Sequence, residues 1–179
     1  MTESEHLAKM HPFLRERVVR VLAAWRAGAA PDETIKIVES VRPLSVQQSY
    51  FKAGKSRADG VTSFSNHQFS PSLACDCIVI RSGKIVAKLS DPAWQAYGDL
   101  VEAEGLTWGG KWKLGDGPHC ELSEVERIKL VQAAVGAVAD GAWGPATAKA
   151  VGARVPLRVG RSGWSSLTPA SWEMLLGGA

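Results

Sequence analysis

The pattern of apolar positions near the N-terminus is helical. Between residues 7 and 27, apolar side chains recur three or four positions apart, with Arg and Glu between them: Leu14, Val18, Val21, Leu22 and Trp25. This period predicts an amphipathic helix. We expect it to begin near Pro12, because proline is favoured in the first helical turn, and to end at Gly28.

An alternating pattern follows this helix. Residues 34–43 (TIKIVESVRP) alternate apolar and polar side chains, which predicts a strand that ends at Arg42-Pro43. Residues 45–53 then predict a short helix, with Ser45 as its N-cap and Gly54 as its stop.

The middle of the chain predicts a loop and then a β-hairpin. Residues 55–73 are polar and rich in Ser, Gly, Asn and Pro, as in a long loop. Residues 74–80 (ACDCIVI) predict a strand. The turn RSGK connects it to a second strand, IVAKLS, and the two strands form the hairpin.

A third helix and a further loop complete this part of the pattern. Residues 92–104 predict a helix that has Pro92 in its first turn and Gly105 after its end. Residues 106–122 (LTWGGKWKLGDGPHCEL) predict a Gly- and Trp-rich loop that runs into a short strand. The order helix, strand, helix, strand, strand, helix, strand predicts an α+β domain over residues 1–121.

The pattern changes at Leu122, and three helix starts follow. They are the capping box Ser123-x-x-Glu126, Pro145 with Thr147 after the turn DGAWGP, and Thr168-Pro169. We therefore predict a small all-α domain of three helices over residues 122–179, too short for a catalytic domain of its own.

Composition and charge narrow the class of protein. Of 179 residues, 45% are hydrophobic and 22% charged, which is typical of a folded globular chain. The net charge of +3 suits an anionic partner but not a nucleic-acid binder, which needs a dense basic stripe. We expect no signal peptide and no stable membrane insertion, because no apolar stretch is long enough for either.

Two of the four histidines lie in loops beside carboxylates. His67 precedes Asp76 by nine positions, and His119 follows Asp116 by three. Two imidazoles, one carboxylate and an open fourth position form the ligand set of a catalytic zinc site, and the second carboxylate would accept a proton from water. On spacing alone, ordinary surface residues are the alternative. His6 and His11 have charged neighbours and are expected at the surface.

Three blocks in residues 42–121 carry a resemblance to a known family. They are RPLSVQQSYFKAGKS (42–56), SNHQFSPSLACD (65–76) and WGGKWKLGDGPHCE (108–121). Together they resemble peptidoglycan metallopeptidases, a family that includes L-alanyl-D-glutamate endolysins and D-alanyl-D-alanine carboxypeptidases and is related to the hedgehog domain. The resemblance implies a small antiparallel sheet with flanking helices.

The resemblance also implies roles for individual residues. His67, Asp76 and His119 would bind Zn²⁺, and Asp116 would be the general base. Arg42 would lie at the substrate carbonyl or carboxylate, and Gln47 would support that side of the site. Ser65 would orient His67. The interval between His67 and Asp76 is longer than the family's usual one and lacks its glycine.

Other residues have a functional and a structural interpretation. Trp108 and Trp112 would contact substrate, or alternatively fill the core around Gly-Gly. Arg42 has the alternative of a surface cation at a strand end. We interpret Cys75, Cys77 and Cys120 as buried small hydrophobes, because neighbours in a strand face opposite ways and would place them away from Asp76 and His119.

Residues 131–151 (VQAAVGAVADGAWGPATAKAV) are similar to the repeat of peptidoglycan-binding domains. This second resemblance implies wall binding through Asp140, Trp143 and Thr147, and Thr147 is also expected to cap the following helix. A purely structural helical cap is the alternative for this domain.

The two resemblances predict a zinc-dependent hydrolase for the peptide stem of peptidoglycan. We expect an L-alanyl-D-glutamate endopeptidase that acts as a phage endolysin, with a D-alanyl-D-alanine carboxypeptidase or a non-catalytic wall-binding or virion protein as alternatives. It would be a monomer that binds peptidoglycan and no nucleic acid. It would stay in the host cytoplasm until release, and then act on the wall in the periplasm.

Overall fold

The chain forms two compact units. The computed structural model describes residues 1–161 and 163–176. The first unit combines Met1–Val41 with Ser72–Leu122, and the second combines Arg42–Pro71 with the chain from Ser123 onward. Each unit is described by itself.

The first unit is built on an antiparallel sheet. Among the described residues its strands are β1 (Glu33–Glu39), β2 (Ala74–Arg81), β3 (Lys84–Ile85), β4 (Leu106–Trp108) and β5 (His119–Leu122). They are ordered β1-β2-β5-β4, and β3 pairs with the free end of β2. Every pairing is antiparallel, which confirms the predicted α+β class with a small antiparallel sheet.

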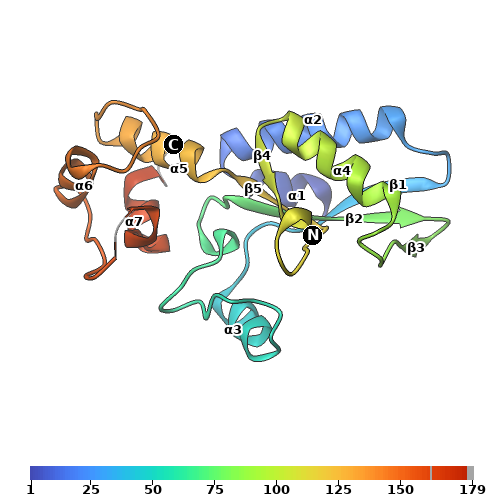
Figure 1. Ribbon diagram of the computed structural model, residues 1–179, viewed down its shortest axis with the longest axis horizontal. Helices are drawn as coiled ribbons and strands as arrows, with labels where there is room; N and C mark the ends of the chain where they lie inside the picture. The colour runs from blue at the N-terminus through green and yellow to red at the C-terminus, as the bar shows by residue number, and fades with distance from the viewer. Residues whose placement is uncertain (162, 177–179) are drawn as a thin grey trace. The chain divides into compact units, whose positions relative to one another are not determined.

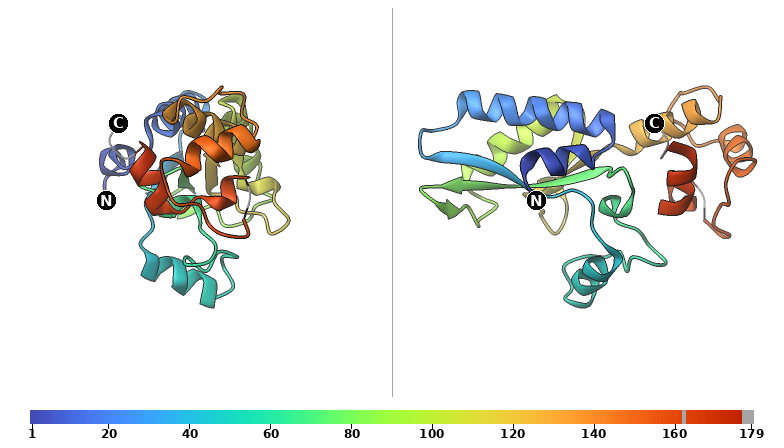
Figure 2. Two further views of the ribbon diagram at one scale, coloured as in Figure 1. Left: turned by 90° about the vertical axis from the view of Figure 1, so that its left-hand side faces the viewer. Right: turned by 180° about the vertical axis from the view of Figure 1, so that it is seen from behind.

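Three α-helices and one 3-10 helix belong to this unit: α1 (Glu3–Ala8), α2 (Pro12–Gly28), α4 (Pro92–Ala103) and η2 (Gly109–Lys111). Helices α2 and α4 lie side by side along the sheet (Figures 1 and 2). The apolar stripe predicted for α2 is buried, which confirms that helix. Helix α1 was not predicted, because its six residues are too few to show a period; Thr2 and Glu5 stabilise it with a capping box.

The two N-terminal histidines are buried, so the expectation that they lie at the surface is wrong. The ring of His6 hydrogen-bonds through Nδ1 to Ser40 Oγ at 3.1 Å. The ring of His11 accepts a hydrogen bond from the Phe13 amide at 3.3 Å and thereby caps α2. Burial lowers the pKa of both imidazoles, which favours the neutral rings that these contacts need.

Two predicted strands are shorter than expected. Strand β1 ends at Glu39 rather than at Arg42-Pro43, because the register shifts between Ile37 and Glu39 in a bulge. Strand β3 stops at Ile85, because the next carbonyl, that of Val86, accepts a hydrogen bond from Trp94 Nε1 at 3.0 Å. The hairpin turn between β2 and β3 is as predicted, with positive φ at Ser82 and Gly83.

The second unit contains the long loop and the helices that follow Leu122. Its described elements are α3 (Leu44–Lys52), the 3-10 helix η1 (Asn66–Gln68), α5 (Glu124–Ala134), α6 (Pro145–Gly152), the 3-10 helix η3 (Gly163–Ser166) and α7 (Pro169–Leu176). Pro43, not Ser45, occupies the N-cap of α3. The three α-helices predicted after Leu122 are present, whereas the predicted domain boundary at that residue stays a prediction.

Among the described residues, every helix is too short or too polar to cross a bilayer.

Candidate metal centre

Asp76 and His119 face each other across β2 and β5. They are direct partners in the antiparallel register. Hydrogen bonds join Cys77 N to Pro118 O and Leu122 N to Leu73 O, so Asp76 and His119 form a non-hydrogen-bonded pair. Side chains approach most closely in such pairs. The register therefore brings Asp76 Oδ1 to 3.0 Å from His119 Nδ1.

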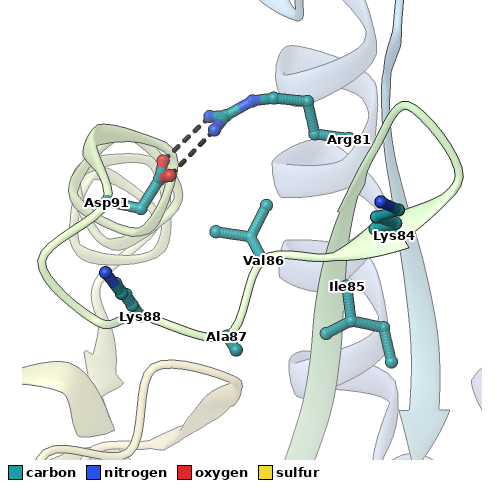
Figure 3. Close-up of a pocket in the computed structure, with 7 residues that line it drawn as sticks. All are labelled: Arg81, Lys84, Ile85, Val86, Ala87, Lys88 and Asp91. Atoms are coloured by element: carbon teal, nitrogen blue, oxygen red, sulfur yellow. Dashed lines mark hydrogen bonds and ion pairs between the residues drawn. The ribbon is translucent and has the colours of Figure 1, made fainter.

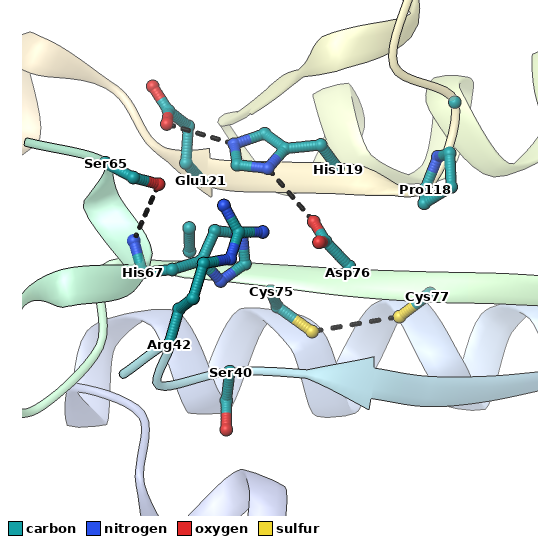
Figure 4. Close-up of polar contacts among 12 residues, drawn as sticks. Ser40, Arg42, Ser65, His67, Cys75, Asp76, Cys77, Pro118, His119 and Glu121 are labelled. Atoms are coloured by element: carbon teal, nitrogen blue, oxygen red, sulfur yellow. Dashed lines mark hydrogen bonds and ion pairs between the residues drawn. The ribbon is translucent and has the colours of Figure 1, made fainter. Parts of the chain in front are cut away.

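Glu121 completes this polar face and was not among the predicted site residues. It follows His119 by two positions, so both side chains emerge on the same side of β5. Its Oε2 lies 3.0 Å from His119 Nε2 (Figure 4). The signal that would have identified it is the spacing H-x-E on a predicted strand, where a period of two places both residues on one face.

The ring of His119 is therefore held between two carboxylates. The side chain is 7% exposed. Burial by itself would lower its pKa, but the hydrogen bonds and negative charges of Asp76 and Glu121 outweigh burial and raise the pKa to about 10. Without a metal, His119 is an imidazolium at neutral pH.

The three cysteines lie on the opposite face of the same strands, as predicted. Cys75 pairs with Cys120 in the register, and Cys75, Cys77 and Cys120 are all buried. Hydrogen bonds from Cys120 and Cys77, together with burial, raise the pKa of the Cys75 thiol well above its usual range. These side chains belong to the core and point away from Asp76 and His119.

The turn that contains Asp116 packs closely against the backbone of Gly109. The Asp116 amide donates to Gly109 O at 2.9 Å, and the His119 amide donates to Asp116 O at 3.3 Å. A Cβ at Gly109 would lie 2.7 Å from Asp116 O and 2.9 Å from His119 Cβ. Only a glycine at position 109 therefore allows the Asp116–His119 turn to approach this closely. Asp116 is exposed and precedes His119 by three positions.

The two tryptophans of this segment differ in exposure. Trp108 is 5% exposed, and its indole N–H donates to Gly117 O at 2.8 Å. Gly98 and Gly110 admit the ring into the core, where a Cβ on either would clash with it, while the predicted substrate role of Trp108 stays a prediction. Trp112 is 42% exposed, and its ring centroid lies 4.8 Å from that of His119.

His67 belongs to the second unit and is almost fully buried, at 1% exposure. It is the middle residue of η1, where Ser65 Oγ accepts a hydrogen bond from the His67 amide at 3.4 Å. Gln68 Oε1 accepts one from the Ser65 amide at 3.0 Å and closes a capping box. The His67 carbonyl accepts one from the Arg42 amide at 2.8 Å. The contact predicted between Ser65 and His67 thus runs through the backbone.

Arg42 and Gln47 form a buried pair in the same unit. Arg42 Nη1 donates to Gln47 Oε1 at 3.0 Å, and the guanidinium carbon lies 4.7 Å from the centroid of the Tyr50 ring. Gln47 is 0% exposed, and its Nε2 donates to Ser56 Oγ and Ala58 O at 2.8 and 2.6 Å. Arg42 is 8% exposed, so the alternative of a surface cation is excluded.

The structure brings three of the predicted ligands together. One ligand atom from each of His67, Asp76 and His119 lies within 4.8 Å of the other two, a spacing at which the three could hold a metal ion. Asp116 is not part of this described group. Two imidazole nitrogens and one carboxylate oxygen are donors that zinc accepts.

A pocket elsewhere in the first unit lacks all of these ligands. It lies beside the β2–β3 hairpin and the start of α4, and Arg81, Val86, Lys88 and Asp91 are among its lining residues (Figure 3). Arg81 donates through both Nη atoms to Asp91 at 2.8 Å. This ion pair fastens the hairpin to the helix start.

Asp140 and Thr147, two of the three residues predicted to bind the cell wall, hold a turn together. Gln132 Nε2 donates to Asp140 Oδ1 at 2.7 Å, to Ala142 O at 2.9 Å and to Thr147 Oγ1 at 3.0 Å. Thr147 is 4% exposed, and its predicted wall contact stays a prediction. Gly144 rather than Thr147 occupies the N-cap of α6, so the expected cap is wrong. The Ala142 amide and Gln132 lower the pKa of Asp140.

Two comparisons with known proteins find similarities to peptidases. Residues 59–122 match the peptidase M15 family model described as D-alanyl-D-alanine carboxypeptidase. No curated protein sequence matches the chain. The crystal structure of the Serratia marcescens L-Ala D-Glu endopeptidase ChiX is similar, with 26% identity and a TM-score of 0.51 over 70% of this chain and 89% of that one. Residues 59–122, which include His67, Asp76 and His119, are thus similar in sequence to the M15 peptidases.

Proposed function

We propose that this chain is a zinc peptidase that hydrolyses the L-alanyl-D-glutamate bond of peptidoglycan. The observation that carries the proposal is the approach of His67, Asp76 and His119 to within 4.8 Å, inside the segment that matches the M15 peptidases. The similarity to an L-Ala D-Glu endopeptidase supports the choice of bond.

The chemistry of the donors fits a catalytic zinc ion. His67, Asp76 and His119 would supply two nitrogens and one oxygen, the ligand count that leaves a fourth position for water. When bound, zinc would supply a Lewis acid for the water nucleophile and the amide carbonyl. Glu121 would accept the Nε2–H of His119 and leave Nδ1 free to bind the ion.

Asp116 would handle the protons of the reaction. Its carboxylate is exposed and lies in the turn that ends at His119. We assign it the removal of a proton from the attacking water and the return of that proton to the leaving amine. Gly109, which permits the close approach of this turn, would keep the Asp116 carboxylate near the ligand.

Arg42 and Trp112 would contact the substrate. The Arg42 guanidinium carries a fixed positive charge, and its bond to Gln47 and its position over Tyr50 restrict its rotamers. It would stabilise the developing negative charge on the substrate oxygen, with Gln47 as its positioning residue. The exposed face of Trp112 would pack against the peptide stem.

D-alanyl-D-alanine carboxypeptidase is the alternative, because the matching family model carries that description. Mass spectrometry of digested peptidoglycan separates the two activities. An endopeptidase creates a new N-terminal D-glutamate, whereas a carboxypeptidase releases free D-alanine. Release of D-alanine alone would overturn the proposed bond.

We further propose that the enzyme acts as a phage endolysin. The test is loss of turbidity of Gram-negative cells stripped of their outer membrane, measured with and without a chelator. Clearing that stops with the chelator and returns with zinc is the expected result. A protein that sediments with peptidoglycan but never clears the cells would instead be a wall-binding protein without hydrolase activity.

A further inference from the structure

The loop that carries His67 packs against the C-terminal helices of its own unit. Phe69, two residues after His67, is 2% exposed. Its ring centroid lies 5.4 Å from that of Trp164 and 6.0 Å from that of Trp172, and the two tryptophan rings are 5.4 Å apart. We call Phe69, Trp164 and Trp172 the aromatic brace.

Arg158 adds to this contact with the loop, and Arg127 contacts the brace itself. Arg158 donates through Nη2 to the carbonyl of Thr62, and its guanidinium carbon lies 5.3 Å from the centroid of the Phe64 ring. Arg127, on α5, places its guanidinium 5.1 Å from the Trp164 ring. The loop is therefore held by the C-terminal helices at several points on the N-terminal and C-terminal sides of His67.

We infer that the aromatic brace positions His67 for metal binding. The C-terminal helices would then be part of the support of the metal site and not only a tether to the wall. This inference rests on the proposed function, because it assigns the brace to the ligand set that the proposed zinc peptidase uses.

The physical reason lies in the irregular backbone of the loop. Residues 53–73 contain no strand, and η1 is their single described helical turn. A ligand in such a segment loses conformational freedom when it binds the ion, and that loss weakens binding unless the loop is already ordered. Phe69 follows His67 by two residues and is buried. The fixed position of its ring therefore limits the movement of the His67 backbone.

The alternative is that the brace stabilises the fold and has no effect on the ligand. Zinc affinity and thermal unfolding separate the two roles, because a stabilising contact alone would lower the unfolding temperature and leave the affinity of the folded protein unchanged. Hydrogen exchange of the zinc-free protein adds a second readout. The amides of Arg42 and His67 report on it directly, since they hydrogen-bond to the His67 carbonyl and to Ser65 Oγ.

The experiment uses the full-length chain. Phe69→Leu keeps an apolar side chain in the core but removes the ring contacts, and Trp164→Ala removes a half-buried ring from the other side of the brace. Met174→Ala is the matched control, because Met174 lies on α7 two residues from Trp172 and is 66% exposed. Zinc affinity is measured by competition with a chromogenic chelator.

We expect Phe69→Leu and Trp164→Ala to weaken zinc binding about tenfold, the range seen when the outer support of a metal ligand is removed. We also expect faster exchange at Arg42 and His67. Met174→Ala should match the wild type in both. Wild-type affinity and exchange in either folded brace variant would overturn the inference, and Trp164→Ala decides alone if Phe69→Leu does not fold.

Failure of the proposed function gives a different result. A wild-type chain that binds no zinc and cleaves no peptidoglycan would reject the proposed enzyme. The exchange comparison on the zinc-free protein would still show whether the aromatic brace orders the His67 backbone, and unchanged exchange in the variants would reject the brace itself.

Discussion

The candidate ligands come from two differently built regions. Asp76 and His119 sit on adjacent strands, where the register of β2 and β5 places them directly opposite each other. His67 sits in a long loop, where a short 3-10 turn, a capping box and buried aromatic rings fix its position. Backbone pairing therefore positions the first two ligands, and side-chain contacts position the third.

This difference separates the effects of substitution in the two regions. A strand-held ligand keeps its place as long as the sheet is intact, because its neighbours are fixed by ladder hydrogen bonds. A loop-held ligand depends on contacts that single substitutions can remove without unfolding the protein. The strand region should therefore respond mainly to changes in the ligands themselves, and the loop region to changes in its support.

The largest effect should follow removal of a strand-held ligand. We expect His119→Ala to abolish zinc binding and peptidoglycan cleavage, because it removes one of three donors and leaves Asp76 and Glu121 without the imidazole between them. Metal content of the purified protein and release of peptide fragments are the measurements. Retention of stoichiometric zinc by this variant would remove His119 from the ligand set.

The control for this variant is Cys75→Ala. Cys75 adjoins Asp76 but points to the opposite face of β2, into the core. Because the thiol is not a ligand, we expect full zinc content and a moderate loss of stability from the small cavity. Loss of zinc in the folded variant would show that the assignment of the two faces is wrong.

Asp116→Asn should separate catalysis from metal binding. The amide is nearly the same size as the carboxylate but cannot accept a proton, so we expect cleavage to fall by about 10²–10⁴-fold while zinc content stays at the wild-type level. Steady-state rates on soluble peptidoglycan fragments, beside metal analysis, are the measurement. An unchanged rate would exclude Asp116 as general base.

Glu121→Gln should have a smaller effect on the strand-held side. Glutamine has the shape of glutamate but a weaker acceptor for the Nε2–H of His119, so the imidazole becomes a weaker ligand. We expect zinc affinity to fall about tenfold, with the fold unchanged. Chelator competition measures this, and an affinity equal to that of the wild type would limit Glu121 to a structural role.

The sequence predicts the fold well where its period is long. The stripe of α2 and the alternation of β2 identify both elements, and the positive φ of Gly54 and Gly105 agrees with their predicted place at helix ends. The strands that are shorter than predicted are shortened by local structure that the pattern does not show. The bulge after Ile37 shortens β1, and the Trp94 indole takes the Val86 carbonyl that a longer β3 would have paired.

The residues of the candidate site also divide into those whose placement the sequence predicts and those whose placement it does not. The alternation of β2 correctly separates Asp76 from Cys75 and Cys77, because strand geometry fixes the faces. Burial is harder to predict from a motif. Trp108 and Thr147 have the residue types of binding surfaces, yet two glycines admit the indole to the core and Gln132 binds the threonine hydroxyl. Gly98 is not a sequence neighbour of Trp108, nor is Gln132 one of Thr147, so the motifs alone do not reveal these contacts.

The smallest expected effect concerns the ion pair at the β2–β3 hairpin of the first unit. Arg81 bonds to Asp91, which also caps α4 by accepting a hydrogen bond from the Ala93 amide at 3.0 Å. The Arg81 guanidinium, followed by the Ala93 amide, lowers the pKa of Asp91 to about 2. An unfolded aspartate titrates near pH ~3.9. The stabilisation is therefore present above that pH and is lost as the pH falls toward 2.

Asp91→Asn isolates this contribution, because asparagine keeps the cap but loses the charge. We expect the free energy of unfolding of the wild type to fall more steeply than that of the variant between pH 4 and pH 2, and the difference to be small because the pair is exposed to solvent. Urea unfolding followed by circular dichroism across this range measures it. Zinc content at neutral pH should be identical in both proteins. A change in zinc content would mean that the position of the strand-held ligands depends on this ion pair and not on strand register alone.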